Sequence, residues 1–425
     1  MKLTNKSKLL LSFFIEHMCI THAKQTRKIN DIFIELYNEI RNAEMYLDTE
    51  KKTKGDPFYN MSYREIESTI QIPKPTTFPV DGFPTEIRTH IDEHILYEIT
   101  YSIHLLGRSI KIHFLLEDNH PISKIHIYND YVDTMLIWLI IINEYASKKC
   151  ATELTIYLYF TSLQKFTPSS NISILGEHNV NTAFTMTCPK ISEIVIFRKE
   201  EWFKVFLHET FHNFGLDFSD MNNEKCNKKI LSTFQVRSEV NLYESYAEFW
   251  AKIMNALFCS YAGLSNKNNI QEFLTNADFF INFEKMYSCF QMVKVLDFMN
   301  LKYKQLYSTN ENISTLRNTL YKENTNVLAY YVITSILLND YQAFIEWCES
   351  NNISLLQFKK TTSNQDKYCN FILTKYKSAT LLRNIKCAEL LIQSIKYTKQ
   401  KKLWKYPNET KYIIKNLRMS ICELG

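Results

Sequence analysis

The sequence predicts an α+β protein, in which a mixed β-sheet with helical cover is followed by an all-helical C-terminal region. Two patterns support this class. Between residues 91 and 199, short β-rich runs surround one helical segment, and from residue 200 onward the apolar residues recur at helical spacing. The chain of 425 residues has only 7 glycines and 9 prolines, which excludes collagen-like and turn-dense all-β designs.

Three segments follow from this pattern, namely residues 1–90, 91–263 and 264–425. The first is a helical and extended N-terminal segment, with a helix at 30–45 and a proline-containing connector at 51–89. The second is the sheet domain, and the third is a helical domain. Within the sheet domain we expect a β-hairpin from 96–106 and 109–116, a helix at 131–146, strands at 154–160, 181–186 and 193–197, and helices at 200–214 and 238–261.

Neither the net charge nor the hydropathy of the sequence indicates a nucleic acid or a membrane as a partner. The net charge is only +5, whereas a nucleic-acid-binding protein of this size would concentrate more basic charge. The two longest apolar runs, 9–15 and 135–142, are far shorter than the roughly 20 residues of a membrane-spanning helix. The first run is also too short for a signal peptide. We therefore expect an intracellular, cytoplasmic protein that is not secreted.

Ten cysteines are scattered along the chain without a Cys-x-x-Cys pair. This spacing argues against zinc modules built on paired cysteines. Wide spacing is typical of reduced core thiols, and it agrees with an intracellular location.

One motif carries recognisable chemistry: His208-Glu209-x-x-His212, within the segment WFKVFLHETFHNFG. Residues four apart lie on the same face of a helix, so two imidazoles can bind one zinc ion at about 2.0–2.1 Å each. Glu209 lies about 100° around the helix, beside the metal, where a general base for a zinc-bound water belongs. The apolar residues before the motif indicate a buried helix, and Gly215 is placed to end it.

A catalytic zinc needs a third protein ligand, and all eleven histidines lie at or before residue 212. One arrangement places this ligand six residues after the second histidine, where Phe218 cannot bind metal and Asp217 is one residue short. The better arrangement uses the next helix, on which Glu244 and Glu248 are four residues apart beside an apolar stripe. Two carboxylates there need a cation or a histidine N–H between them. We expect Glu244 to bind zinc and Glu248 to accept the outer N–H of a ligand histidine, although swapped roles also satisfy the pattern.

This motif, followed by a helix with Glu244-x-aromatic-Ala-Glu248, resembles the gluzincin metallopeptidases and is especially similar to the catalytic domain of anthrax lethal factor and its relatives. The resemblance covers residues 150–262. It implies a zincin-like mixed β-sheet with an active-site helix, zinc ligands His208, His212 and Glu244, and Glu209 as the base. The chain, including residues 323–338, also resembles uncharacterised predicted proteins of large DNA viruses that infect protists, which implies a viral origin.

The resemblance also implies a residue that stabilises the oxyanion. Lethal-factor-like enzymes carry a tyrosine seven residues before the glutamate ligand, and Arg237 has that position here. Arg237, Tyr243 and Tyr246 are therefore the candidates for this role.

The motif and the resemblance together predict a zinc-dependent metallopeptidase that hydrolyses peptide bonds, with a zinc-bound water activated by Glu209. Its partner would be a polypeptide substrate, added as a strand along a sheet edge at 181–186 or 193–197. One alternative is a catalytically inactive zincin-fold protein with a structural or interaction role, such as a component of the virus particle. Another is a helical scaffold in which the motif is accidental. Retention of Glu209, which a purely structural metal site does not need, favours the enzyme.

Overall fold

The computed structural model describes residues 1–17, 24–55, 58–78, 82–118, 121–400 and 407–425. Within these residues, the strands of the sheet are β1 (Asn60–Glu65), β2 (Tyr97–Leu105), β3 (Arg108–Leu116), β4 (Glu153–Phe160), β5 (Ala183–Thr185) and β6 (Ile191–Ile196). They form one mixed sheet in the order β1-β2-β3-β4-β6-β5. The β3–β4 and β4–β6 pairs are parallel, and the β1–β2, β2–β3 and β5–β6 pairs are antiparallel.

Helices make up most of the rest of the described chain. They are α1 (Asn5–His17), α2 (Arg27–Lys54), α3 (Thr85–His94), α4 (Ile125–Tyr145), α5 (Glu177–Val180), α6 (Trp202–Asn213), α7 (Glu224–Thr233), α8 (Leu242–Ala262), α9 (Ile270–Phe298), α10 (Glu311–Leu320), the π-helical segment η5 (Leu328–Ile333), α11 (Thr334–Asn339), α12 (Tyr341–Asn351), α13 (Thr362–Lys375), α14 (Ala379–Gln400) and α15 (Pro407–Lys415).

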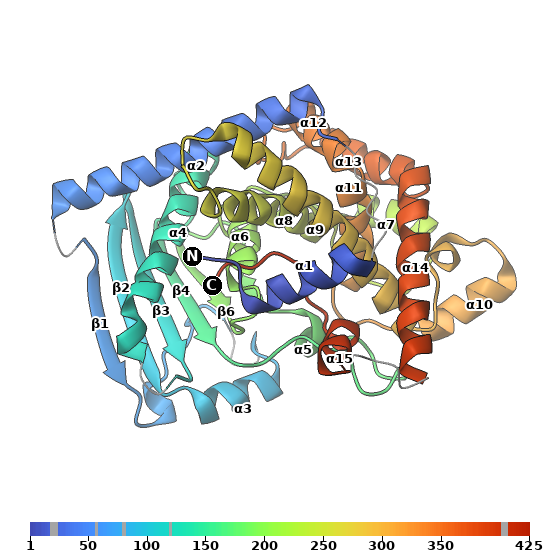
Figure 1. Cartoon of the computed structure of the whole chain (residues 1–425), viewed down its shortest axis with the longest axis horizontal. Helices are drawn as coiled ribbons and strands as arrows, with labels where there is room; N and C mark the ends of the chain where they lie inside the picture. The colour runs from blue at the N-terminus through green and yellow to red at the C-terminus, as the bar shows by residue number, and fades with distance from the viewer. Residues whose placement is uncertain (18–23, 56–57, 79–81, 119–120, 401–406) are drawn as a thin grey trace.

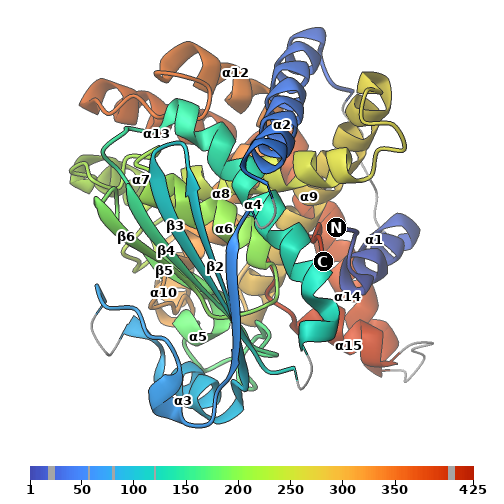
Figure 2. The same cartoon turned by 90° about the vertical axis from the view of Figure 1, so that its left-hand side faces the viewer.

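The sheet buries residues on both faces, because successive side chains of its central strands alternate between two groups of buried residues. In β4, Ile156 and Leu158 belong to the main core, which they share with α4 and α6, while Tyr159 faces the other side. Helix α3 covers that other side through Ile87 and Ile91 (Figures 1 and 2). The sheet is therefore a middle layer, and α6 lies on the face that borders the main core.

The helices on the main-core side form successive layers. Helix α6 contacts β5 and β6, α8 packs on α6, and α9 packs on α8, with α11 and α14 against α9 (Figure 1). Apolar side chains from all three segments expected from the sequence, such as Leu36, Leu207 and Leu337, belong to one continuous core. The core therefore includes residues on both sides of the segment boundaries expected after residues 90 and 263.

Residues 416–424 form a buried segment that runs beside the start of α6. The main-chain N–H groups of Met419 and Ser420 donate to the carboxylate of Glu201, the residue that precedes α6. The next two N–H groups donate to Glu284 of α9. The start of α6 is therefore connected to a segment more than two hundred residues away, and this segment also meets the N-terminal residues in an antiparallel bridge (Figure 1).

Most of the elements expected from the sequence are confirmed. Strands β2 and β3 form the expected hairpin around Gly107, whose φ of 74° favours glycine. The other expected elements of the sheet domain correspond to α4, β4, β5, β6, α6 and α8.

Two expectations about the sheet are wrong. The connector expected at 51–89 contains strand β1 and the start of α3. All six residues of β1 are exposed, so the strand has no buried face, and its pairing with β2 defines it. The segment 193–197 is not a sheet edge, because β6 lies between β4 and β5.

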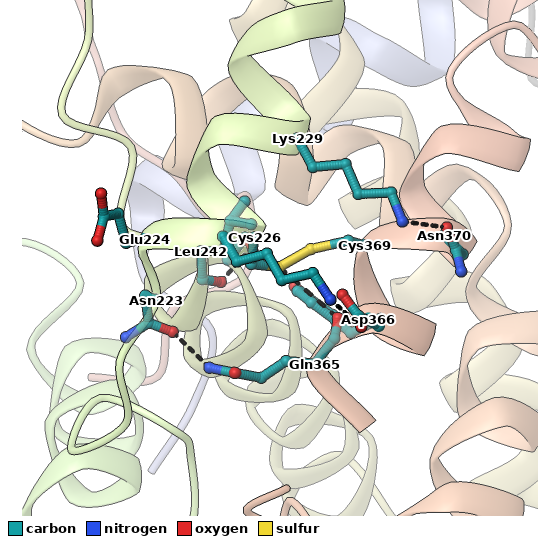
Figure 3. Close-up of a disulfide and its surroundings, with 12 residues drawn as sticks. Asn223, Glu224, Cys226, Lys229, Leu242, Gln365, Asp366, Cys369 and Asn370 are labelled. Atoms are coloured by element: carbon teal, nitrogen blue, oxygen red, sulfur yellow. Dashed lines mark hydrogen bonds and ion pairs between the residues drawn. A yellow bond between two sulfur atoms is a disulfide. The ribbon is translucent and has the colours of Figure 1, made fainter. Parts of the chain in front are cut away.

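Two disulfides, Cys150–Cys188 and Cys226–Cys369, join segments that are distant in sequence. The second connects α7 with α13 and is drawn with its surroundings in Figure 3. These bonds correct the expectation of reduced core thiols, because spacing along the chain does not reveal which thiols the fold brings together. Five further cysteines are not in disulfides, and Cys19 lies outside the described residues.

One helical stretch, Pro121–Tyr145, is long and apolar enough to cross a bilayer by length and composition. Half of its apolar window is buried inside the protein, where α4 packs against α2. A core helix has the same properties, so the absence of a membrane partner stays a prediction.

Lys165 and Glu201 form an ion pair whose side chains are 1% and 0% exposed. Lys165→Met would leave the buried carboxylate without this partner, and we expect the free energy of unfolding to fall by about 3–5 kcal/mol. Urea unfolding followed by circular dichroism measures the change. Lys228→Met, which removes an exposed partner of Glu224, is the matched control and should leave the midpoint unchanged. Equal midpoints for the two variants would contradict the stabilising role of the buried pair.

Candidate metal centre

Tertiary contacts fix both ends of helix α6, which carries the motif of residues 208–212 and is buried throughout. The helix begins after Glu201, whose backbone is left-handed with a φ of 61°. It ends before Gly215, as expected, where a φ of 64° turns the chain away. A Cβ at this glycine would make a tight contact of 3.3 Å with the Cβ of Cys188, and the positive φ would strain any residue that has a side chain.

Three acceptor atoms converge at one point beside α6. Nε2 of His208 lies 3.1 Å from Nε2 of His212. Oε2 of Glu244 lies 3.0 Å from the first of these nitrogens and 3.3 Å from the second. Glu244 belongs to the first turn of α8, which packs directly on α6. In the part of the chain that the structure describes, these three side chains form a group close enough to hold one metal ion.

The outer nitrogens of both rings face carboxylates. Nδ1 of His208 lies 3.0 Å from Oε2 of Glu248, and Nδ1 of His212 contacts Oδ2 of Asp217. An ionised carboxylate only accepts hydrogen bonds, so each Nδ1 carries a proton, and a ring that is neutral presents a lone pair at Nε2. Two such lone pairs and the oxygen of Glu244, at 3.0–3.3 Å, would repel one another, so the three atoms need a cation among them, either a metal ion or a proton on a ring.

The spacing of the three atoms also suits a metal ion. Ligand atoms in a tetrahedral site with bonds of about 2.0–2.1 Å lie about 3.3 Å from one another, close to the separations found here. Three protein ligands leave one tetrahedral position open. Two imidazoles and a carboxylate form a donor set that first-row transition metals accept.

The charges around the three atoms favour a cation at this point. Burial alone would lower the pKa of His212, but Asp217 and Glu244 outweigh burial and raise this pKa well above its usual value. Burial alone would raise the pKa of Glu244, yet the two rings hold it below its usual range. Burial opposes ionisation of Glu248 as well, and Lys204, with Nζ at 2.9 and 3.0 Å from its oxygens, keeps its pKa low. Both glutamates therefore stay ionised beside the rings.

Glu209 lies next to the three converging atoms without being one of them. Its side chain lines a cavity together with His208, Tyr330 and Met419. No described residue donates a hydrogen bond to its carboxylate, and burial raises its pKa. Glu209 is therefore free to accept a proton within this cavity.

Tyr330 is a site residue that sequence patterns did not single out. Its hydroxyl donates to Oε2 of Glu244 at 3.0 Å, and its ring centroid lies 5.9 Å from that of His208. It belongs to the π-helical segment η5, and such turns are frequent at functional sites. Tyr330 is 86 residues from Glu244 in sequence, so no local spacing could indicate the contact.

The candidates that the sequence offered for the oxyanion role have other surroundings. Tyr246 is buried and donates to the main-chain oxygen of Leu356. Arg237 is exposed and lines a different pocket. Tyr243 meets the ring of His212 edge-on at 5.8 Å between centroids, so it is the one of the three that borders the metal ligands.

The two residues considered at the six-residue spacing have supporting roles. Asp217 holds the outer nitrogen of His212, and its other oxygen accepts the N–H and hydroxyl of Ser219. Phe218 packs in the core against Phe358. The sequence therefore pointed to Asp217 but did not predict that it would orient a ligand.

Comparisons with models of protein families, with curated proteins and with solved structures find no match to this chain. The interpretation of the site therefore depends on its own geometry and chemistry.

We expect the purified protein, reconstituted with zinc, to contain about one zinc ion per chain by plasma mass spectrometry. His208→Ala and Glu244→Ala each remove one of the three donors and should lose most of the metal. Glu209→Gln leaves the three donors intact and should retain it. If Glu244→Ala keeps a full zinc content, the third ligand must be another carboxylate. A wild type without zinc would contradict the metal centre.

Asp217→Asn should weaken zinc affinity about 10–100-fold, because the neutral amide no longer fixes the proton on Nδ1 of His212. Competition with a chromophoric chelator measures the affinity. Asp220→Asn is the matched control, since its carboxylate pairs with Lys360 at 2.8 Å, away from the rings. An affinity of Asp217→Asn equal to that of the control would show that the contact has no orienting role.

Proposed function

We propose that this chain is a zinc-dependent metallopeptidase of the gluzincin type, which hydrolyses peptide bonds. One observation carries the proposal: Nε2 of His208, Nε2 of His212 and Oε2 of Glu244 converge beside a cavity lined by the carboxylate of Glu209, to which no described residue donates a hydrogen bond. A structural metal site usually has four protein ligands and needs no base. Three ligands with an adjacent base are what metal-assisted hydrolysis needs.

Zinc is the metal that this donor set favours. His208, His212 and Glu244 would hold it, and two histidines with one glutamate are typical of catalytic zinc sites. When bound, zinc polarises a carbonyl group and lowers the pKa of a coordinated water toward about 7. Glu248 and Asp217 orient the two rings through their outer nitrogens.

Glu209 is the proposed base. No residue in the described part of the chain donates to its carboxylate, so it can take a proton from the attacking water and deliver it to the departing amine. Tyr330 is the proposed electrophilic helper, and it takes the role for which the sequence offered Arg237, Tyr243 or Tyr246. Burial and the charge of Glu244 raise the pKa of Tyr330 well above its usual value, so its phenol stays protonated and can donate to the developing oxyanion.

The surroundings of α6 support a zincin-like domain with a polypeptide substrate. Helix α6 packs against β5 and β6, and β5 is an edge strand antiparallel to β6. Residues 181–183, at the start of β5, line the Glu209 cavity. An extended peptide that pairs with β5 would pass the metal ligands while main-chain hydrogen bonds fix its direction. The substrate path therefore follows β5, one of the two segments considered from the sequence.

The zinc-loaded protein should cleave members of a random peptide library, with the products identified by mass spectrometry. Glu209→Gln keeps the size of the side chain but removes the base, so kcat should fall about 10²–10⁴-fold while the zinc content is unchanged. Tyr330→Phe removes one hydrogen-bond donor and should lower kcat about 10²-fold.

Tyr303→Phe is the matched control for the tyrosine, because this residue is buried and its hydroxyl donates to the main-chain oxygen of Tyr376 instead of the site. Its activity should be close to that of the wild type. A protein that binds zinc but cleaves no peptide would contradict the peptidase and favour the catalytically inactive zincin-fold role.

A further inference from the structure

The cavity beside Glu209 is small, and Met419 forms part of its wall. Its volume is about 30 Å³, and the wall residues Val205, Glu209 and Met419 are 5%, 7% and 4% exposed. One water molecule needs about 10–15 Å³ by this measure, so the cavity has room for about two. A side chain of one or two heavy atoms would fill it.

Hydrogen bonds hold the backbone around Met419 in place. Its own N–H donates to the carboxylate of Glu201 at 3.0 Å. Two residues earlier, the N–H of Leu417 donates to the main-chain oxygen of Lys165 at 2.8 Å, and its carbonyl accepts from Tyr331 at 2.7 Å. The segment therefore cannot shift outward to enlarge the cavity without breaking buried hydrogen bonds.

The charged groups in the wall other than Glu209 are already paired. Lys165 pairs with Glu201 and Lys204 with Glu248, and none of these side chains is more than 3% exposed. An acidic side chain that entered the cavity would lose its hydration and face the carboxylate of Glu209, and the cavity is too small for lysine or arginine. The cavity therefore suits small uncharged groups.

We infer that the enzyme selects glycine, alanine or serine at one position next to the cleaved bond, because Met419 and Val205 exclude larger side chains. The position adjoins the cleaved bond, since His208 and Glu209 line the same cavity. Met419 is thus a specificity-determining residue contributed by the C-terminal segment. This inference rests on the proposed peptidase function.

The test compares kcat/KM for two peptides that differ only at this position, one with alanine and one with leucine, after a peptide library has located the cleaved bond. The wild type should prefer alanine. Met419→Ala enlarges the cavity and should raise the leucine-to-alanine ratio about tenfold or more, the usual effect of fitting one or more methylene groups. Val205→Ala enlarges the same cavity from α6 and should shift the ratio in the same direction. It removes fewer buried atoms than Met419→Ala and should therefore lower the free energy of unfolding less.

Met292→Ala is the matched control, because this methionine of α9 is equally buried but does not line the cavity. Its ratio should equal that of the wild type, and the ratio is independent of how much protein is folded. A wild type that accepts leucine as well as alanine, or a ratio unchanged in both cavity variants, would overturn the inference and leave the peptidase intact. No cleavage of any peptide by the zinc-loaded wild type would overturn the proposed function and the inference together.

Discussion

A buried carboxylate holds the outer nitrogen of each motif histidine, and this constraint explains much of the architecture around the site. Glu248 reaches His208 only because α8 lies against α6, and the same contact brings Glu244 to the inner nitrogens. Asp217 reaches His212 because the chain turns back at Gly215. Two rings that are held in this way must direct their lone pairs at one point, so the site is preorganised for a cation.

Ionised groups without water need partners, and the partners come from distant parts of the chain. Lys204, one turn before His208 on α6, neutralises Glu248. Glu201, at the start of the same helix, binds Lys165 and the N–H groups of Met419 and Ser420. The C-terminal segment is therefore part of the support of α6, and it contributes a wall of the cavity as well.

The sheet and the helices have separate roles in the proposed function. The sheet offers β5 as an edge strand for an extended peptide, while α6, α8 and η5 provide the base, the ligands and the phenol of Tyr330. The helices after residue 263 are not an independent addition to this arrangement. They supply Tyr330 and pack α8 into position, so the proposed catalytic groups span two of the segments that composition alone separates.

Local periodicity was enough to predict α6, α8, the hairpin and the spacing of Glu244 and Glu248, because helical and strand geometry depend on near neighbours in sequence. It also led to the two histidines and to Glu209, since a four-residue spacing places the rings on one face. Local periodicity did not indicate five other features: Tyr330, the orienting role of Asp217, the exposed strand β1, the two disulfides and the cavity wall at Met419. Each depends on which distant segments touch, and only the packed core with its buried charges decided those contacts.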